Sequence, residues 1–185
     1  MTKDIDKKEL KKQQRKKEKK ERKEKQRNKV DKKTAIKRIV LLVLIIIWAV
    51  FVFGFSSQTG EESSGLSTKI ANLFFDSEEM IKIAKPIIRK LAHFSEYALG
   101  GTLIYLLIDT YEFTNKKKFW ISLGLGIWYA AIDELHQTFV PNRSGNIIDV
   151  CIDTLGIFVG ILFIKLVLML INKIKNNKIK KQSAN

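Results

Sequence analysis

The sequence predicts an all-α fold, that of a polytopic membrane protein in which a four-transmembrane-helix bundle follows a disordered or helical basic N-terminal arm. Two observations lead to this prediction. Four segments are long and apolar enough to cross a bilayer, which takes about 20 residues, and they lie at about 36–55, 87–108, 119–140 and 147–171. The connections between them alternate between strongly and weakly basic, as the loops of a membrane protein do.

The N-terminal arm, residues 1–38, carries most of the net charge. The whole chain has 34 Lys and Arg against 19 Asp and Glu, a net charge of +15, and the arm alone has 19 basic and 7 acidic side chains. Its few hydrophobic residues cannot offset the entropy of ordering a core. We therefore expect a polybasic cytoplasmic arm that attracts anionic lipid head groups. Nucleic acid is not the expected partner, because the arm lacks a recognition motif.

The first apolar segment is the clearest of the four. Residues 39–55 read IVLLVLIIIWAVFVFGF, without a charged or amide side chain. A cleaved signal peptide is the rival interpretation, but the charged region before this segment is far longer than that of a signal peptide. The other three segments carry ionisable residues, so that hydropathy alone identifies them less well.

The placement of Lys and Arg predicts the topology, because positive loops stay on the cytoplasmic side. With four spanning helices, 27 of the 34 basic side chains lie in the arm, in the connection 109–118 and in the tail, and six lie on the opposite side. We therefore expect a multi-pass protein of the cell membrane with both termini in the cytoplasm. Its transmembrane domain would occupy 39–172, and a basic cytoplasmic tail would occupy 173–185.

Two connections would then face outward. Residues 141–146, PNRSGN, form a short turn, which makes the helices on either side antiparallel neighbours. The longer connection 56–86 places Leu66, Ile70, Leu73 and Phe74 on one face of a helix. It is either an interfacial amphipathic segment or lid, or a loop that packs on the bundle.

Polar side chains form a stripe on each of the last three predicted helices. Each stripe keeps to one helical face and contains small residues as well. The stripes consist of Arg89, His93, Glu96 and Gly100; of Gly126, Ala130, Asp133 and Gln137, with His136 beside them; and of Asp149, Asp153, Gly156 and Gly160. In the predicted topology the polar parts face the outer half of the bilayer, so that we expect one polar cluster there, above closely packed glycines.

This cluster holds more acid than base. Carboxylates within a span cost roughly 2.5 to 3.5 kcal/mol each on insertion scales. The fixed positive charges within reach are Arg89 and Arg143, with Lys90 near the rim, whereas the acids are Glu96, Asp133, Glu134, Asp149 and Asp153. Protonated His93 or His136, shared carboxyl protons, or a bound cation or cationic ligand group would balance the excess.

Several of these residues also have a purely structural interpretation. Asp149 follows Asn146 by three positions and would then only cap the last helix. Glu96 and His93 would form an intrahelical pair, and Arg143 would be a solvated loop charge. We favour an anion clamp for Arg143, because a guanidinium group binds phosphate or carboxylate through two hydrogen bonds.

Three strings of the sequence resemble the VanZ-like family. RKLAHFSEYALGG at 89–101 and DELHQTFVPNRSGNIIDVCIDTLG at 133–156 resemble its two signature regions, and SSQTGEESSGLS at 56–67 resembles its segment after the first helix. The resemblance covers roughly residues 39–160. It implies a small multi-spanning bacterial membrane protein, of a family first linked to low-level resistance to the glycopeptide antibiotic teicoplanin. The motif positions fall on His93, Glu96, Asp133, Glu134, His136, Gln137, Arg143, Asp149 and Asp153, the last being a departure where we expect Asn in relatives.

Two classes of function remain open. In the first, which we favour, the protein is no enzyme and binds an envelope lipid, a lipid-linked envelope precursor or a lipoglycopeptide, and so contributes to glycopeptide resistance or envelope homeostasis. In the second, it is an intramembrane enzyme that uses Glu or Asp and His for acid–base chemistry on a lipid-linked phosphate. The sequence holds neither a nucleophile elbow nor an H-E-x-x-H zinc motif. It identifies no cofactor but leaves room for a divalent cation.

The candidate residues differ between these two classes. For ligand binding they are Arg89, His93, Glu96, Asp133, Glu134, His136, Gln137, Arg143, Asp149 and Asp153. For catalysis they are Glu96, His93, Asp133, Glu134 and His136.

Overall fold

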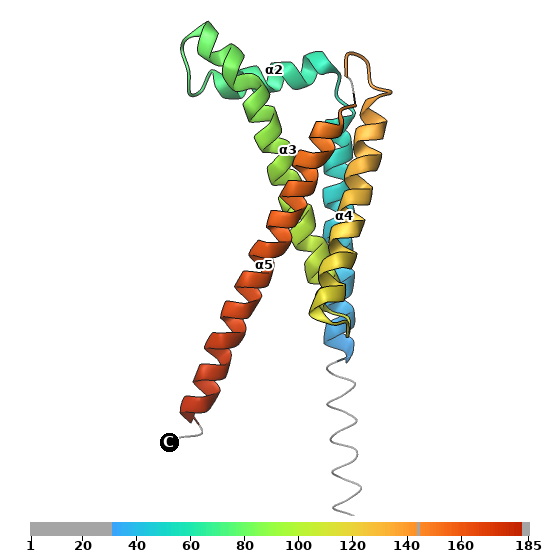
Figure 1. The fold of residues 1–185 in the computed structure, drawn as a ribbon, viewed down its shortest axis with the longest axis vertical. Coiled ribbons are helices and arrows are strands. Elements are labelled where there is room, and N and C mark those ends of the chain that lie inside the picture. Colours follow the sequence, from blue (N-terminus) through green and yellow to red (C-terminus); the bar gives the residue numbers. More distant parts are fainter. Residues whose placement is uncertain (1–30, 144, 183–185) are drawn as a thin grey trace, which may run out of the picture. The chain divides into compact units, whose positions relative to one another are not determined.

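The computed structural model describes residues 31–143 and 145–182, and these residues form helices joined by short connections (Figure 1). The helices are Asp31–Ser56, α2 (Gly60–Ala71), α3 (Glu78–Asp109), α4 (Asn115–Gln137) and α5 (Ile147–Gln182). The described part of the chain contains no strand, which confirms the all-α prediction there. Most of the predicted basic arm, residues 1–30, lies outside the described residues. Residues from Leu41 onward belong to the packed unit that holds the core and the candidate site.

Three of the described helices are long and apolar enough to cross a membrane by length and composition: Asp31–Ser56, α3 and α5. Helix α4, with 23 residues, is not among them. Three lysines follow one another at its start, and Asp133, Glu134 and His136 lie near its end, so that the apolar stretch between them is short. The chain is therefore a membrane protein with several apolar helices. Length and composition support three of the four predicted spans.

The observed helices are longer than the predicted segments at several ends. Helix α3 begins at Glu78 rather than at 87, and it continues through Pro86. Two acidic residues, Glu78 and Glu79, stabilise its first turn by their interaction with the helix dipole. Helix α5 continues to Gln182 rather than to 171. The lysines of the predicted tail lie near its C-terminus, where the helix dipole favours positive charge.

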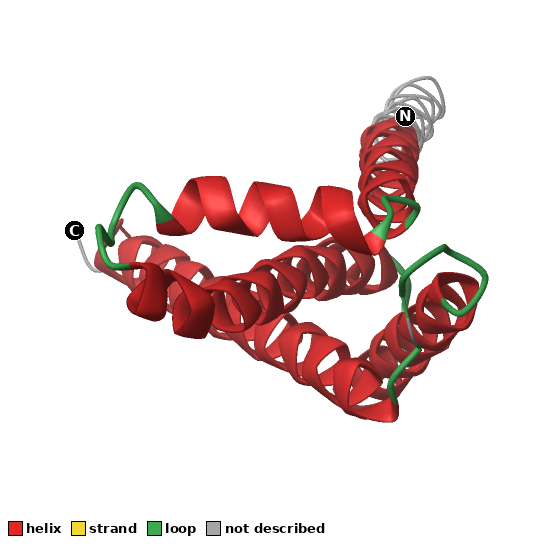
Figure 2. Cartoon of the chain, turned by 90° about the horizontal axis from the view of Figure 1, so that it is seen from above, coloured by secondary structure: helices red, strands yellow, loops and turns green. Residues whose placement is uncertain are grey.

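Helix α2 occupies the first half of the long connection at 56–86. It begins with a capping box, in which Thr59 and Glu62 each bind the backbone N–H of the other. Its buried residues are the small ones, Ser63, Ser67 and Ala71, and the helix packs against α3. In Figures 1 and 2, α2 lies crosswise to the long helices. Of the four residues on the predicted apolar face, Leu66 and Ile70 lie on α2, whereas Leu73 and Phe74 follow its end and are 79 % and 73 % exposed.

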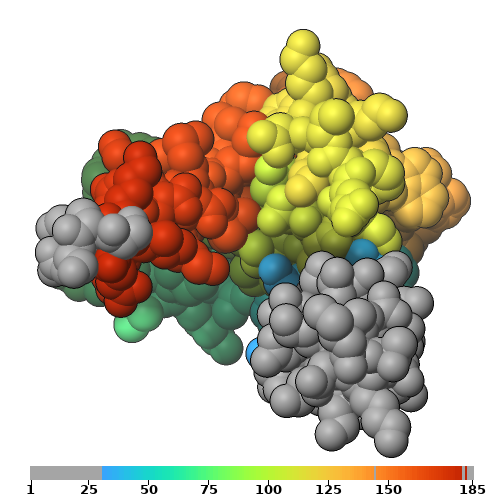
Figure 3. All heavy atoms as spheres, turned by 90° about the horizontal axis from the view of Figure 1, so that it is seen from below, coloured from blue at the N-terminus to red at the C-terminus, as the bar shows by residue number. Residues whose placement is uncertain are grey.

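Helices α3 and α5 cross at close range through the predicted glycines. A side chain on Gly156 or Gly160 would collide with the carbonyl oxygens of Phe94 and Ala98 on α3. The close approach also lets Thr102 Oγ1 donate a hydrogen bond to the Gly160 carbonyl at 3.1 Å. Beyond this crossing α5 diverges from α4, and its last turns lie well to one side of the start of α4 in Figures 1 and 3. The prediction that glycines allow the helices to approach is confirmed for this pair.

The core lies around Trp48, which is only 5 % exposed. Its indole N–H donates to the backbone carbonyl of Glu96 at 2.8 Å, and the absence of a side chain at Gly100 makes room for the ring. Tyr97 and Ile157 complete this core and have no exposed surface. The first helix is thereby fixed against α3 at the level of the predicted polar stripe.

Candidate functional site

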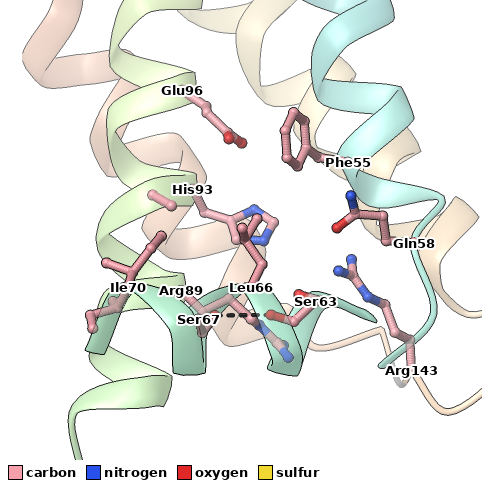
Figure 4. A pocket seen from close by; sticks show the side chains of 12 residues that line it. Phe55, Gln58, Ser63, Leu66, Ser67, Ile70, Arg89, His93, Glu96 and Arg143 are labelled. Atoms are coloured by element: carbon pink, nitrogen blue, oxygen red, sulfur yellow. Dashed lines mark hydrogen bonds between the residues drawn. The ribbon is translucent and has the colours of Figure 1, made fainter. Parts of the chain in front are cut away.

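A pocket of about 80 Å³ lies between the end of the first helix, α2 and α3 (Figure 4). Its apolar lining consists of Phe55, Leu66, Ile70, Ile88 and Ala92. Its polar lining consists of Gln58, Ser63, Ser67, Arg89, His93, Glu96 and Arg143. Four of the predicted site residues thus line one pocket: Arg89, His93 and Glu96 come from the stripe on α3, and Arg143 comes from the turn between α4 and α5.

The two arginines bring positive charge into this pocket. Arg143 donates from a terminal guanidinium nitrogen to the backbone carbonyl of Ser56 at 3.3 Å, and this bond ties the α4–α5 turn to the end of the first helix. The Nε of Arg143 is buried and has no hydrogen-bond partner among the described residues. Burial, and next the charge of Arg89, lower the pKa of Arg143. The pocket is therefore lined by two guanidinium groups whose positive charges repel each other.

Three polar residues near the end of α4 lie outside the pocket lining and are almost completely buried. Asp133 is 1 %, and Glu134 and Gln137 are each 3 % exposed. Asp133 accepts hydrogen bonds from the Tyr97 hydroxyl at 3.0 Å and from the Gln137 amide at 3.3 Å. Glu134 accepts from the backbone N–H of Asn146 at 2.6 Å. These bonds join α4 to α3 and to the start of α5.

Asp153 of α5 faces His93 of α3. Their Oδ1 and Nδ1 atoms are 3.8 Å apart, and Asp153 has no exposed surface. Neither carboxylate oxygen of Asp153 has a hydrogen-bond partner among the described residues, and neither has His93 Nδ1. His93 thus connects the pocket with the buried acids, since its imidazole lines the pocket and also approaches Asp153.

Asp149 does not form the capping box that its spacing allowed. The backbone N–H of Asn146, which that box requires, is bound by Glu134 instead. The side chain of Asn146 accepts from the backbone N–H of Ile148 at 3.0 Å and caps the helix alone. Asp149 lies 3.8 Å from the Lys90 ammonium group and forms an ion pair at the rim.

His136 stands apart from the pocket. Its ring packs against Phe53 of the first helix, with ring centroids 4.2 Å apart. The sequence places it next to the stripe on α4, and one position along a helix turns a side chain by about 100°. It therefore contacts the first helix, whereas Asp133 and Gln137 face the helix bundle.

The side chains that could bind a metal ion are dispersed in this arrangement. Within residues 31–143 and 145–182, no three His, Cys, Asp or Glu side chains are grouped so that they could hold an ion together. Glu134 is held by Asn146 and Asp133 by Tyr97 and Gln137, whereas His136 packs against Phe53. The site thus consists of a pocket that contains two arginines and of a buried group of acids that His93 connects with it.

Two residues of the site were missed in the sequence. Tyr97 has no exposed surface and binds Asp133, and Asn146 binds Glu134 and caps α5. A signal for Tyr97 exists, because it follows His93 by four positions and so shares its helical face. A buried tyrosine hydroxyl also needs a hydrogen-bond partner, for which a carboxylate across the bundle is suited.

Comparison with known protein families gives a match over most of the chain. The model of the VanZ/LLP1 family matches residues 41–169, which is more than half of the chain and contains every residue of the pocket. Neither a curated protein nor a solved structure matches with significance.

Proposed function

Because the chain belongs to the VanZ/LLP1 family, we propose that it is a cell-membrane protein whose pocket binds the polar head of an amphiphile. The ligand is an envelope lipid, a lipid-linked envelope precursor or a lipoglycopeptide. By binding it, the protein contributes to resistance to teicoplanin-type glycopeptides or to envelope homeostasis.

We also propose that α4 crosses the bilayer as a fourth span, with both termini in the cytoplasm. In support, the acids of α4 are buried against the other helices rather than exposed to lipid. Asp133 in particular is hydrogen-bonded, which lowers the cost of placing a carboxyl group at membrane depth. Four spans put most basic residues on one side, as cytoplasmic loops require. The pocket then lies near the outer surface.

The mixed lining of the pocket is the observation that carries the binding proposal. Arg89, His93 and Glu96 supply polar groups from one face of α3, and Phe55 and Leu66 supply apolar surface on the facing elements. A ligand pocket of this kind fixes a polar group by a few convergent side chains and covers the rest of the ligand with apolar ones. An amphiphile offers these two kinds of surface next to each other.

Glu96→Gln tests the binding proposal in cells. The change keeps the size of the side chain and removes a carboxylate that accepts hydrogen bonds from hydroxyl or amino groups of the ligand's polar head. We therefore expect cells that make this variant to be as susceptible to teicoplanin as cells without the protein. Glu79→Gln is the matched control, because Glu79 is exposed at the start of α3 and lies outside the pocket. Teicoplanin susceptibility is measured at equal protein abundance in the membrane, and full resistance with Glu96→Gln would contradict the proposal.

Acid–base catalysis on a lipid-linked phosphate is a second candidate, favoured by the approach of Asp153 to His93. A carboxylate beside one imidazole nitrogen orients the ring, and the other nitrogen is then available to exchange protons with a ligand in the pocket. Glu96 lines the same pocket and is a second group able to transfer a proton. Incubation of the purified protein with a lipid phosphate tests this candidate, and recovery of unchanged lipid would contradict it.

A further inference from the structure

Two guanidinium groups line the same pocket although they come from distant parts of the chain. Arg89 lies on α3, and Arg143 lies in the turn between α4 and α5 (Figure 4). Like charges repel each other, more strongly when water is partly excluded, and burial together with Arg89 lowers the pKa of Arg143. A fold that brings two such groups together gains stability when an anion lies between them.

The described side chains provide little to neutralise this pair. Ion pairs join Lys90 to Asp149, His93 to Asp153 and Lys118 to Asp109, whereas neither Arg89 nor Arg143 forms one within residues 31–143 and 145–182. Glu96 is the only acidic residue of the pocket lining. Within the pocket lining, two fixed positive charges thus face one carboxyl group. Asp133 and Glu134 also attract Arg143, but they lie outside this lining and accept hydrogen bonds from other residues of the bundle.

We infer that the polar end of the pocket binds a phosphate group between Arg89 and Arg143. This inference rests on the proposed function and names the chemistry of the ligand's head. A guanidinium fork matches the oxygens of a phosphate through two hydrogen bonds, and the buried Nε of Arg143 is a donor without an acceptor among the described residues. Gln58 and Ser63 add neutral donors to the same lining.

The other half of the lining indicates what the phosphate is attached to. Phe55, Leu66, Ile70 and Ala92 form an apolar wall beside the arginines. The cavity of about 80 Å³ has room for a compact head group, so that a chain attached to the phosphate would continue along this wall. A phosphate on an alkyl chain fits both parts of the lining, and free phosphate fits the arginines alone.

The experiment compares three probes on purified full-length protein in a phosphate-free maltoside detergent. Octyl phosphate carries both groups, octanol carries the chain alone, and inorganic phosphate carries the charge alone. We expect octyl phosphate to bind at least about tenfold more tightly than octanol, and its affinity to fall as salt rises. Displacement of octyl phosphate by inorganic phosphate at similar concentrations would assign the site to free phosphate, and no displacement would assign it to a lipid phosphate.

Arg89→Gln and Arg143→Gln test the residues themselves. Each is expected to weaken octyl phosphate at least about tenfold and to leave octanol unchanged, because only the charged contact is lost. Lys90→Gln removes the same charge from the neighbouring position at the rim and should change neither affinity more than about twofold. Arg89→Lys keeps the charge without the fork and should fall between the wild type and Arg89→Gln. Thermal unfolding confirms that each variant is folded.

The outcomes separate this inference from the proposed function. If octanol and octyl phosphate bind equally and the arginine variants bind both as the wild type does, the pocket is an amphiphile site without a phosphate group, and the inference is wrong. If neither amphiphile binds the wild type, the proposed function fails as well. Tight octyl phosphate binding that depends on both arginines supports both.

Discussion

Gly160→Leu is expected to lower the free energy of unfolding by about 3 kcal/mol, the upper part of the range for overpacked cores. A side chain at this position would collide with the backbone carbonyl of Ala98, and a carbonyl in a helix cannot turn away as a flexible side chain can. The helices would have to separate, and the hydrogen bond from Thr102 to the Gly160 carbonyl would be lost. Unfolding of the purified protein by increasing SDS in mixed micelles measures the effect.

Gly124→Leu is the control for this experiment. Gly124 also lies in a long helix, and a Cβ there would meet nothing within 4 Å, so that leucine should change the free energy of unfolding by less than about 0.5 kcal/mol. Equal stability of the two leucine variants would show that α3 and α5 are not in contact at Gly160.

His93→Leu is expected to destabilise the protein by about 3 kcal/mol, because it removes the polar group that faces the buried carboxyl group of Asp153. Asp153 has no exposed surface, and its oxygens have no hydrogen-bond partner among the described residues, so that His93 is the group placed to compensate it. The double variant His93→Leu with Asp153→Leu removes both polar groups at once. It should regain most of the lost stability, since replacing a whole buried pair by apolar residues is often neutral or stabilising.

The four proteins of this double-mutant cycle are compared by the same unfolding measurement. A coupling energy of at least about 2 kcal/mol between the two positions is expected for a pair in contact. Additive effects would mean that His93 and Asp153 do not act as a pair, and the second candidate function would lose the observation that favours it.

Helical spacing predicted the part of the site that lies on one helix face. Arg89, His93 and Glu96 recur at intervals that keep them on one side of α3, and all three line the pocket. The glycines of α5 were likewise predicted to allow close approach, because small residues let helix backbones meet. These two predictions depend only on periodicity, which the sequence contains directly.

The features that the sequence did not predict depend on tertiary contacts between helices. Different helices pack against the different faces of α4, and the sequence does not show which helix lies against the face that carries His136. Only the packed structure shows that His136 contacts Phe53 of the first helix. The bond between Glu134 and Asn146 prevents the capping box expected for Asp149 and joins residues from two helix ends. The face of α2 that packs on α3 is built from Ser63, Ser67 and Ala71, because in a membrane protein close approach of small residues can outweigh the burial of apolar ones. Residue patterns along one helix do not contain these relations.

The central claim, that the pocket holds an amphiphile, is tested most directly by native mass spectrometry of protein purified in a mild detergent. We expect one amphiphile bound to each wild-type chain, and none bound to Ala92→Trp, whose indole would fill the pocket that Ala92 lines. Leu99→Trp is the control, because Leu99 is exposed on α3 and lies outside the pocket lining. It should keep the ligand of the wild type. If Ala92→Trp retains the same bound amphiphile as the wild type and Leu99→Trp, the ligand lies elsewhere on the protein and the claim is wrong.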